Sequence, residues 1–462
     1  MTSLRTVAAV EAGKAASLAS RVLRRGGGTA LPGLVAERID PRLVANLGRS
    51  LGGGRVLVTG TNGKTTTSRI VASALTQAGL PFIHNREGSN LMRGIASTLL
   101  EHASPLGRIP DAPRAIGLFE TDEATLPAAA DALAPRALVF TNLFRDQLDR
   151  YGEVDTVAAL WRKALAASPP VSTLVLNADD PSVAELATGW AGPVHWFGLD
   201  DVSFATESAG AFDARWCNCG GNYTYERRYF AHVGWWRCTT CDRRRATPET
   251  SASALSLELD SCTFEVRGMG RAEMPLTGLY NVYNALAAIA LCRVLGIGDE
   301  SIASGLATVA PAFGRQETVN LQGRRLRLLL AKNPAGANQV LLLLRSIAHR
   351  FPGELNVALL LNDRFADGQD VSWIWDVDHE LLTGQVTRTW AGGDRAEDLA
   401  VRMKYAGWPV PSTVEHQAGA LLDAILRDTQ AGDDVFVIPT YTAMRDLREE
   451  LHRRGAVAGA ME

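Results

Sequence analysis

The sequence predicts an α/β protein with a central domain, a cysteine-rich insertion and a separate C-terminal α/β domain. Short β-branched strands alternate with helix-like segments on both sides of the insertion, a pattern typical of parallel sheets covered on both faces. Four cysteines within residues 217–241 interrupt that pattern. With 462 residues, the chain is long enough for two or three domains with sizeable cores.

The first predicted unit is an N-terminal helical lead, residues 1–50. Residues 1–25 scatter charges among small residues, which favours a leading helix over a signal peptide. No apolar run is long enough to span a membrane. Hydrophobic residues make up 46%, charged residues 21%, and the formal net charge is -3. We therefore expect a cytoplasmic protein without a nucleic-acid partner, in which the arginines at 227–228 and 243–245 are solvated.

The central domain is predicted to span residues 51–316, with the insertion at about 212–246. A strand at 55–58 precedes a glycine- and threonine-rich turn and a helix that ends at Gly79. A strongly apolar helix begins near Asn281, and the remaining residues, 317–462, show four strand–loop–helix units. The other predicted strands of the central domain are residues 115–120, 137–142 and 173–177.

The strongest signal is the segment VLVTGTNGKTTTSRIVASAL, residues 56–75. Glycines let a backbone wrap closely around a phosphate, and a helix N-terminus adds about half a positive charge. Lys64 can hold the β- and γ-phosphates of ATP, and the Thr65 hydroxyl can ligate Mg²⁺. Val58 stands where the general NTPase loop has glycine, so this loop is a shortened variant. The predicted ATP-binding residues are Gly60, Thr61, Asn62, Gly63, Lys64, Thr65 and Thr66.

The motif GTNGKTT resembles the ATP loop of the Mur ligases and folylpolyglutamate synthetases. Further segments are similar to motifs of that family and follow in the same order. They are LFETDEA (118–124), TNLFRDQLDRYG (141–152), NADDP (177–181), YNVYN (280–284), GRQE (314–317) and AKNPAGANQ (331–339).

The resemblance implies roles for residues outside the loop. Glu120 would help to hold Mg²⁺, and Arg315 would reach the phosphates from an interdomain hinge. Lys332 and Asn333 would supply a closing contact from the C-terminal domain. Asn281 and Asn284 would lie near the nucleotide.

Three departures from the family pattern narrow the resemblance to one branch. Few residues precede the loop, Lys163 is displaced from the position of the carbamylated lysine of amino-acid ligases, and the cysteine-rich insertion is foreign to those enzymes. With NDRFADGQDVSWIWDVDHE (362–380), these features resemble the MurT branch. The resemblance implies amidation of the D-glutamate α-carboxyl of lipid II in peptidoglycan biosynthesis, at the inner face of the membrane, with a GatD-like glutamine amidotransferase as partner.

To activate a carboxylate with ATP, the enzyme must neutralise negative charge, because the carboxylate and the γ-phosphate are both anions and must be brought into line. Lys64, with Mg²⁺ held by Thr65 and Glu120, is a sufficient set of groups. Asp122 and Glu123 are alternative metal ligands, although we expect solvated side chains at a helix start.

The ammonia for the amide must be released by a glutaminase, which needs an activated cysteine. Cys262 and Cys292 sit in apolar segments that predict inert thiols, so a separate amidotransferase subunit is expected. By resemblance, Asp370 completes the partner's Cys/His pair, with Asp367 and Asp376 as alternatives and helix capping as the plainer reading. Trp373 and Trp375 are either partner anchors or alternate residues of a half-buried strand.

The segment CNCGGNYTYERRYFAHVGWWRCTTC predicts a structural zinc ribbon. Two close pairs of thiolates suit tetrahedral Zn²⁺ with no open position. His232 is an alternative ligand, but a surface or packed histidine is favoured. The aromatic residues between the pairs are expected to pack the ribbon itself. The predicted zinc ligands are Cys217, Cys219, Cys238 and Cys241.

Two other functions stay open at this point. A stand-alone ligase of the Mur or folylpolyglutamate type would act without a second subunit and would need a carbamylated lysine. A non-catalytic, nucleotide-gated zinc-ribbon scaffold would bind ATP without turnover.

Overall fold

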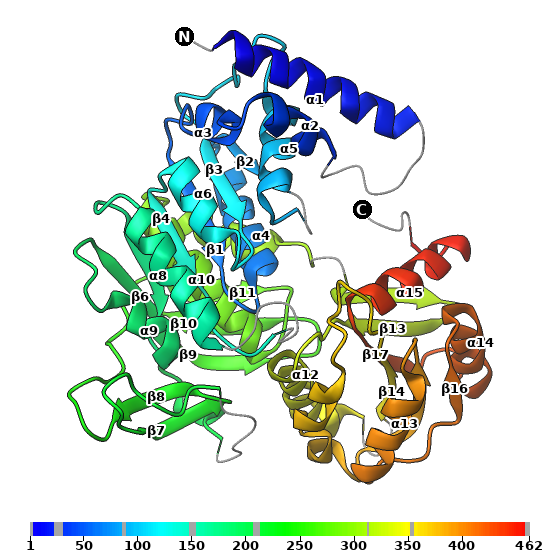
Figure 1. The fold of residues 1–462 in the computed structure, drawn as a ribbon. Coiled ribbons are helices and arrows are strands. Elements are labelled where there is room, and N and C mark those ends of the chain that lie inside the picture. The colour runs from blue at the N-terminus through cyan, green and yellow to red at the C-terminus, as the bar shows by residue number, and fades with distance from the viewer. Residues whose placement is uncertain are drawn as a thin grey trace.

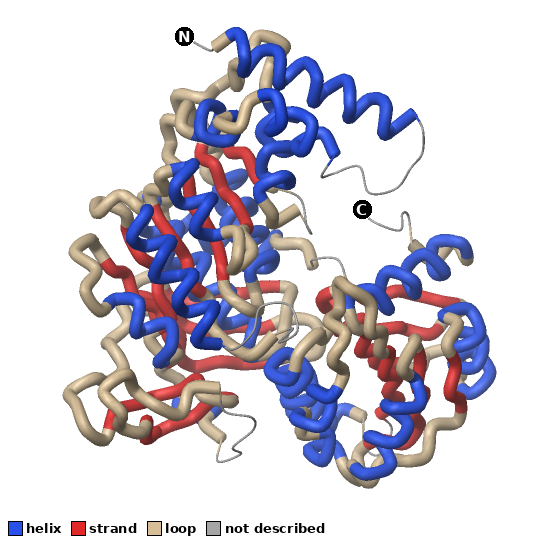
Figure 2. Tube along the Cα trace, viewed as in Figure 1, coloured by secondary structure: helices blue, strands red, loops and turns tan. Residues whose placement is uncertain are grey.

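The computed structural model describes residues 3–22, 31–85, 89–146, 154–206, 213–311, 314–351 and 355–457. The ribbon in Figure 1 shows two α/β bodies, a hairpin on the central one and helices at the N-terminus. In each body, red strands lie between blue helices in Figure 2. None of the helices among these residues is long and apolar enough to cross a bilayer.

The N-terminal helices belong to the core of the central domain. They are α1 (Leu4–Val22), α2 (Leu31–Ile39) and α3 (Leu43–Gly48). Leu43, Leu47 and Ala36 are fully or almost fully buried in one cluster with residues of the sheet. Buried apolar area is what stabilises such an attachment, so the lead is part of the domain's packing rather than an arm.

The central sheet has nine strands in the order β11-β10-β9-β6-β5-β4-β1-β3-β2. All pairings from β2 to β9 are parallel, whereas β9, β10 and β11 pair antiparallel. The antiparallel end was not predicted from the alternating pattern. The strands are β1 (Arg55–Thr59), β2 (Phe82–His84), β3 (Ile116–Glu120), β4 (Ala137–Phe140), β5 (Thr173–Asn177), β6 (Val194–Leu199), β9 (Thr250–Leu257), β10 (Cys262–Val266) and β11 (Gly270–Met274).

Helices cover both faces of this sheet. Successive side chains of a strand point to opposite faces, so Val56 and Val58 pack under one helix layer while Leu57 packs under the other. The first layer is α4 (Lys64–Gln77), α10 (Leu279–Leu295) and α11 (Asp299–Thr308). The second includes α5 (Met92–His102), α6 (Leu126–Leu133) and α8 (Val154–Ala167). The short α9 (Pro181–Ala184), η1 (Glu185–Ala187) and η2 (Val202–Phe204) lie between strands.

The insertion contains the antiparallel hairpin of β7 (Tyr223–Phe230) and β8 (Val233–Cys238). Cys262 and Cys292, outside it, are fully buried, and burial raises the pKa of each thiol to about 12. An unexposed thiol that stays protonated is a poor nucleophile, as predicted for these two residues.

The C-terminal domain is a six-stranded sheet in the order β12-β13-β17-β14-β15-β16. One face packs against α12 (Pro334–Ile347) and α13 (Ala396–Tyr405), and the other against α14 (Ala418–Asp428) and α15 (Tyr441–Arg453). The four predicted units are present, and β12 and β16 add edges that were not predicted. The strands are β12 (Arg315–Leu321), β13 (Arg324–Leu329), β14 (Leu355–Leu360), β15 (Val386–Gly392), β16 (Thr413–Glu415) and β17 (Asp434–Pro439).

The segment with Trp373 and Trp375 is not a strand. It forms the 3₁₀ helix η4 (Ser372–Asp376), one of three short helices with η3 (Ala348–Arg350) and η5 (His379–Leu382). Trp373 packs partly buried against the core, while Trp375 is 51% exposed and meets Tyr405 edge-on with ring centroids 5.6 Å apart. The strand alternative for the tryptophan spacing is therefore wrong.

Candidate active site

The glycine-rich turn lies where β1 ends, beside the carboxyl ends of β3 and β4. Gly60 and Gly63 have positive φ angles of 135° and 88°. A Cβ atom on Gly63 would lie 2.0 Å from Asn284 Oδ1, and one on Gly60 would lie 2.1 Å from Thr141 Oγ1. Both the backbone conformation and the close approach therefore require glycine. Ligands of parallel α/β sheets bind at this edge.

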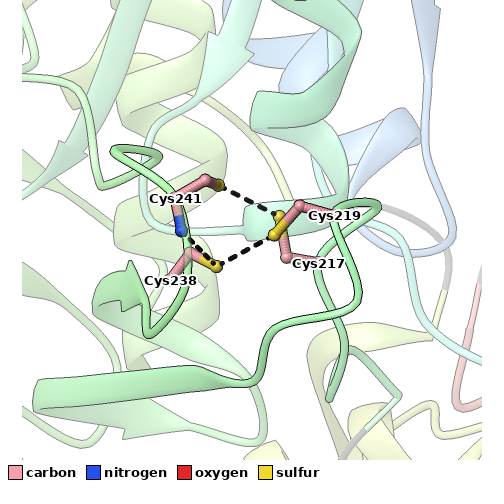
Figure 3. A group of neighbouring side chains, drawn as sticks. All are labelled: Cys217, Cys219, Cys238 and Cys241. Carbon is pink, nitrogen blue, oxygen red and sulfur yellow. Dashed lines mark hydrogen bonds between the residues drawn. The ribbon is translucent and has the colours of Figure 1, made fainter.

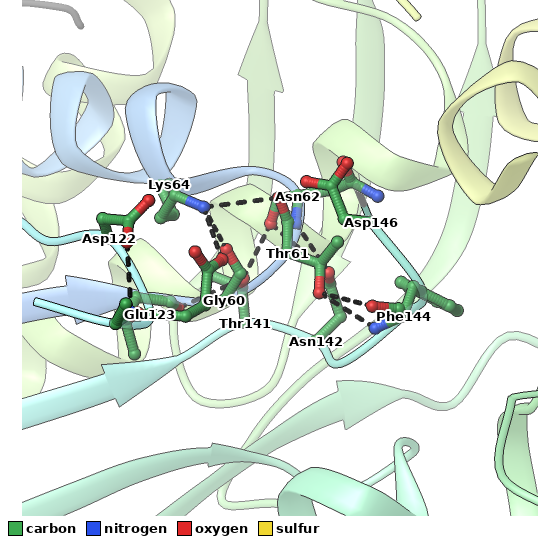
Figure 4. Close-up of polar contacts among 12 residues, drawn as sticks. Gly60, Thr61, Asn62, Lys64, Asp122, Glu123, Thr141, Asn142, Phe144 and Asp146 are labelled. Atoms are coloured by element: carbon green, nitrogen blue, oxygen red, sulfur yellow. Dashed lines mark hydrogen bonds and ion pairs between the residues drawn. The ribbon is translucent and has the colours of Figure 1, made fainter. Parts of the chain in front are cut away.

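Lys64 is the first residue of α4 and its ammonium group is buried. Nζ donates to Gly60 O at 2.5 Å and to Glu123 Oε1 at 2.7 Å (Figure 4). Burial lowers the pKa of Lys64, but the Glu123 carboxylate and its acidic neighbours outweigh this effect, so the pKa lies above its usual value. The turn thus presents a permanently charged cation at a helix N-terminus, which suits a polyphosphate.

Three buried acidic residues lie at the end of β3: Glu120 is its last residue, and Asp122 and Glu123 follow it. Asp122 and Glu123 are each 7% exposed, so the expectation of solvated side chains at a helix start is wrong: both lie in the layer that faces the phosphate loop. Burial raises the pKa of Glu123, against the opposing influence of Lys64.

Glu120 has the environment that a cation requires. Its backbone is fixed by Asn85, whose side chain accepts from Glu120 N at 2.8 Å and donates to Glu120 O at 2.9 Å. The residue as a whole is 4% exposed, and its negative charge helps to raise the pKa of Lys64. Because a buried carboxylate is costly unless a cation balances its charge, these residues fit a bound metal ion.

The loop after β4 is joined to the phosphate loop by hydrogen bonds. Asn142 O accepts from Thr61 N at 3.0 Å, and Asn142 Oδ1 accepts from Asn62 N at 2.9 Å. Thr61 Oγ1 accepts from Phe144 N at 2.9 Å and donates to Phe144 O at 3.1 Å. We refer to residues 141–146 as the β4 loop. Its predicted continuation through Asp149 lies outside the described residues.

Two predicted asparagines meet this turn from α10. Asn284 Nδ2 donates to Asn281 Oδ1 at 3.0 Å, and both residues are buried. The side chain of Asn284 packs on Gly63, as the close approach above shows. Arg315 is the first residue of β12, where its backbone pairs with Leu329; its side chain lies outside what the structure describes.

The C-terminal domain reaches the same place. Asn333 caps α12 and exchanges hydrogen bonds with Asn62, at 3.1 Å and 3.3 Å. Lys332 pairs with Asp146 of the β4 loop. The residues that the sequence assigned to a closing contact therefore lie against the phosphate loop and its neighbour.

The four clustered cysteines converge, with all their sulfur atoms within 4.8 Å of one another (Figure 3). Backbone amides of Thr240 and Cys241 point at Cys238 Sγ and lower the pKa of that thiol to about 6. A sulfur that is readily deprotonated and held among three others has the donor set and spacing of a tetrahedral metal site.

The insertion is fastened to the central domain by contacts that were not predicted. Arg245, expected to be solvated, pairs with the fully buried Asp179 at 2.5 Å. Two aromatic residues of the hairpin donate to Leu199 O, each at 3.0 Å: Tyr229 through its hydroxyl and Trp235 through its indole. These aromatics thus pack the ribbon onto the sheet as well as onto itself. The acidic pair in NADDP was the available signal, but a short motif does not reveal its distant partners.

The three candidate aspartates of the C-terminal domain have different environments. Asp367 is buried and caps α15 by accepting from Thr442 N at 2.8 Å. Asp376 lies 3.5 Å from Arg145. Asp370 is exposed, and hydrogen bonds from the Ser372 side chain and from Ser372 N, the latter at 2.9 Å, lower its pKa.

Family models match both bodies of the chain. Residues 58–215 match the Mur ligase middle domain, and residues 330–444 match the MurT ligase C-terminal domain. A pseudomurein peptide ligase type C from Methanothermus fervidus superposes with a TM-score of 0.65 over 87% of this chain and 79% of its own, at 19% identity. MurF ligase from Thermotoga maritima, solved with ADP, gives a TM-score of 0.60 over 91% and 85%, at 14% identity. The fold is that of a Mur ligase, as predicted, and it implies ATP and Mg²⁺.

Sequence relatives identify the branch. The chain is 32% identical to the MurT subunit of lipid II isoglutaminyl synthase (glutamine-hydrolyzing) from Staphylococcus aureus strain COL, over 97% of this chain and 98% of that protein. It is 33% identical to the corresponding subunit from Streptococcus pneumoniae strain R6, over 95% of each. The chain therefore belongs to the MurT family of Mur ligases and is an ATP-dependent amide ligase.

Proposed function

We propose that this chain is the ligase subunit of a lipid II isoglutaminyl synthase. It amidates the α-carboxyl of D-glutamate in lipid II to D-isoglutamine, using ammonia from a GatD-like glutamine amidotransferase, at the inner face of the cell membrane. The position of Lys64 carries this proposal: a buried ammonium at a helix N-terminus faces acidic residues suited to a metal. The MurT relatives match 95–97% of the chain, which supports the choice of substrate and partner.

The residues around the turn divide the work of holding ATP. The backbone of Gly60, Thr61, Asn62 and Gly63 surrounds the phosphates, with Thr66 following in the helix. Asn281 and Asn284 would lie near the nucleotide, Lys332 would contact it from the C-terminal domain, and the family resemblance implies that Arg315 would reach its phosphates. Thr65 and Glu120 would hold Mg²⁺, which when bound supplies neutralising charge on the phosphate oxygens.

The proposed reaction has two steps. A carboxylate oxygen of D-glutamate attacks the γ-phosphorus of ATP, the bond to the β-phosphate oxygen breaks, and an acyl phosphate and ADP result. Ammonia then attacks the acyl carbon, phosphate leaves, and a proton is lost to give the amide. Lys64 stabilises the charge that develops on the transferred group, moving from Glu123 to the phosphate as ATP binds.

The four cysteines would hold Zn²⁺ as a structural site. Four sulfur ligands leave no open position for a reacting molecule, so the metal would supply folding energy to the insertion. Cys217, Cys219, Cys238 and Cys241 would be its ligands.

The partner subunit is proposed because this chain lacks an exposed thiol with a base beside it among the described residues outside the cluster: Cys262 and Cys292 are buried. Asp370, on an exposed turn of the C-terminal domain, would complete the partner's Cys/His pair. Lys163 is exposed to solvent on α8, which disfavours the stand-alone amino-acid ligase.

The test is the mass change of lipid II. The chain is purified with and without a co-expressed glutamine amidotransferase, and lipid II, ATP and either glutamine or ammonium are supplied. Replacement of a hydroxyl by an amino group lowers the stem-peptide mass by about one dalton. We expect this change with ammonium in both preparations and with glutamine only beside the partner. An unchanged mass under every condition would refute the proposal.

A further inference from the structure

Three consecutive amides of the β4 loop are each held by a different part of the chain. Leu143 N donates to Asp180 Oδ2 at 2.9 Å, and Phe144 N donates to Thr61 in the phosphate loop. Arg145 N donates to Asp213 Oδ2 at 3.0 Å. Asp213 belongs to the insertion, so the insertion holds a loop that itself holds the nucleotide turn.

Contacts from the insertion to this loop are buried or partly buried, and they come from two segments of the insertion. The Asp213 side chain is 6% exposed and also accepts from Arg145 Nε at 2.5 Å. From the turn between β7 and β8, the ring of His232 stacks near that of Phe144, with centroids 4.6 Å apart. Phe230 lies on the same ring at 6.1 Å. The insertion therefore touches both the backbone and the side chain of the β4 loop.

His232 is fully buried, and its Nε2 lies 3.4 Å from Asp180 Oδ1. Among the described residues, neither ring nitrogen makes a hydrogen bond. The residue therefore acts here mainly by packing. Asp180 Oδ1 already accepts from Ser182 N and Val183 N as the cap of α9, so the carboxylate is fixed and His232 rests on a rigid support.

We propose that the insertion positions the nucleotide site: Asp213 and His232 hold the β4 loop so that Phe144 and Asn142 keep the phosphate loop in its binding shape. The insertion thereby becomes part of the catalytic unit in addition to its own metal-stabilised fold. Asp213 and His232 are positioning residues, because they act through the loop. This inference rests on the proposed use of the turn for ATP, but not on lipid II as substrate.

The proposal can be tested in the unmodified protein, because it couples nucleotide binding to the contact between the insertion and the β4 loop. If contact of the insertion with the β4 loop strengthens nucleotide binding, then nucleotide binding must strengthen that contact by the same free energy. Hydrogen exchange of the full chain is measured with and without ADP and Mg²⁺. We expect slower exchange in residues 141–146 and also in the β7–β8 turn at 230–236. Protection of the phosphate loop without any change in the turn would overturn the inference.

A matched set of variants gives the second test. Asp213→Ala removes the carboxylate that accepts from Arg145 N and Nε. Asp213→Asn keeps one acceptor oxygen, and Glu226→Gln alters an exposed residue of the same insertion. We expect Asp213→Ala to weaken ADP binding on the order of tenfold, with a smaller effect for Asp213→Asn and none for Glu226→Gln. KM for ATP rises by the same factor while kcat at saturating ATP changes little.

The outcomes separate this inference from the proposed function. Normal ADP affinity in a folded Asp213→Ala chain, with unchanged exchange of the β4 loop, would overturn the inference and leave amidation untouched. If Asp213→Ala does not fold, the exchange experiment on the unmodified chain decides. If the unmodified chain does not amidate lipid II but ADP still protects both the β4 loop and the β7–β8 turn, the substrate proposal alone is refuted.

Discussion

Replacing Gly63 by alanine tests how closely the phosphate turn is built. The residue has a φ of 88°, where an L-residue costs about 1–2 kcal/mol. The new methyl group would also lie 2.0 Å from Asn284 Oδ1, and overpacking of this kind costs about 1–3 kcal/mol. We expect Gly63→Ala to lower the free energy of unfolding by about 2–5 kcal/mol. Because Asn284 must move, turnover should fall on the order of hundredfold.

Gly79 supplies the matched control. It ends α4 with a φ of 63°, and a Cβ there would meet nothing within 4 Å. Gly79→Ala should therefore lose about 1–2 kcal/mol from backbone strain alone and keep its activity. Urea unfolding gives the two stabilities, and initial rates at saturating ATP give the two activities. Equal losses of stability and equal activity in the two variants would show that the contact with Asn284 does not shape the turn.

Four further expectations follow from the site and its surroundings. Lys64→Ala should lower kcat on the order of hundredfold or more in the ammonium-dependent assay, because the cation that stabilises the transferred phosphoryl group is lost; normal turnover would refute its role. Cys219→Ser should reduce the bound zinc measured by elemental mass spectrometry and lower Tm, whereas an unchanged metal content would exclude the four-sulfur site. Asp370→Asn should abolish glutamine-dependent but not ammonium-dependent amidation, while Asp376→Asn, in the same assays, should keep both; the reverse result would assign the triad to Asp376. Burial holds the pKa of His379 at about 4 against an ordinary 6.5, so the unfolded chain takes up a proton that the folded chain refuses. The free energy of unfolding should therefore fall by about 3 kcal/mol as the pH drops from 6.5 to 4, and it should not depend on the titration of this residue above pH 6.5. Urea unfolding across this pH range measures the effect, and a His379→Gln chain whose free energy of unfolding depends on pH in the same way would contradict it.

Local sequence predicted the parts of the site that are local in structure. The turn from Gly60 to Thr66 joins one strand to one helix, so its glycines, lysine and threonines specify a single short-range geometry. The strands at 115–120 and 137–142 were predicted because short, mostly apolar runs are typical of strands buried on both faces of a parallel sheet. Burial of Asp122 and Glu123 was missed because it depends on α4 and on Lys64, which lie elsewhere in the chain.

The edge strands, and the contacts that attach the insertion to the central domain, could not be predicted from local sequence patterns. β12 is an edge strand that pairs antiparallel with β13 across a two-residue turn. The alternation of apolar and polar residues along an edge strand is weak, so the sequence did not reveal it. The ion pair of Asp179 with Arg245 joins residues 66 positions apart. A run of three arginines is usually a solvated surface, and only the fold shows that one of them lies over a buried carboxylate.

The same pair explains why the insertion sits where it does. Asp179 is fully buried, and burial raises its pKa against the lowering effect of Arg245. A buried carboxylate that loses its cationic partner costs several kcal/mol, so Arg245 of the insertion stabilises the sheet around Asp179. Tyr283 of α10 donates to the same carboxylate at 2.7 Å, and it is the residue next to Asn284 on that helix. The insertion, the acidic pair and the nucleotide helix are thus joined through one carboxylate, and an insertion that was merely appended would not need such a costly group at its base.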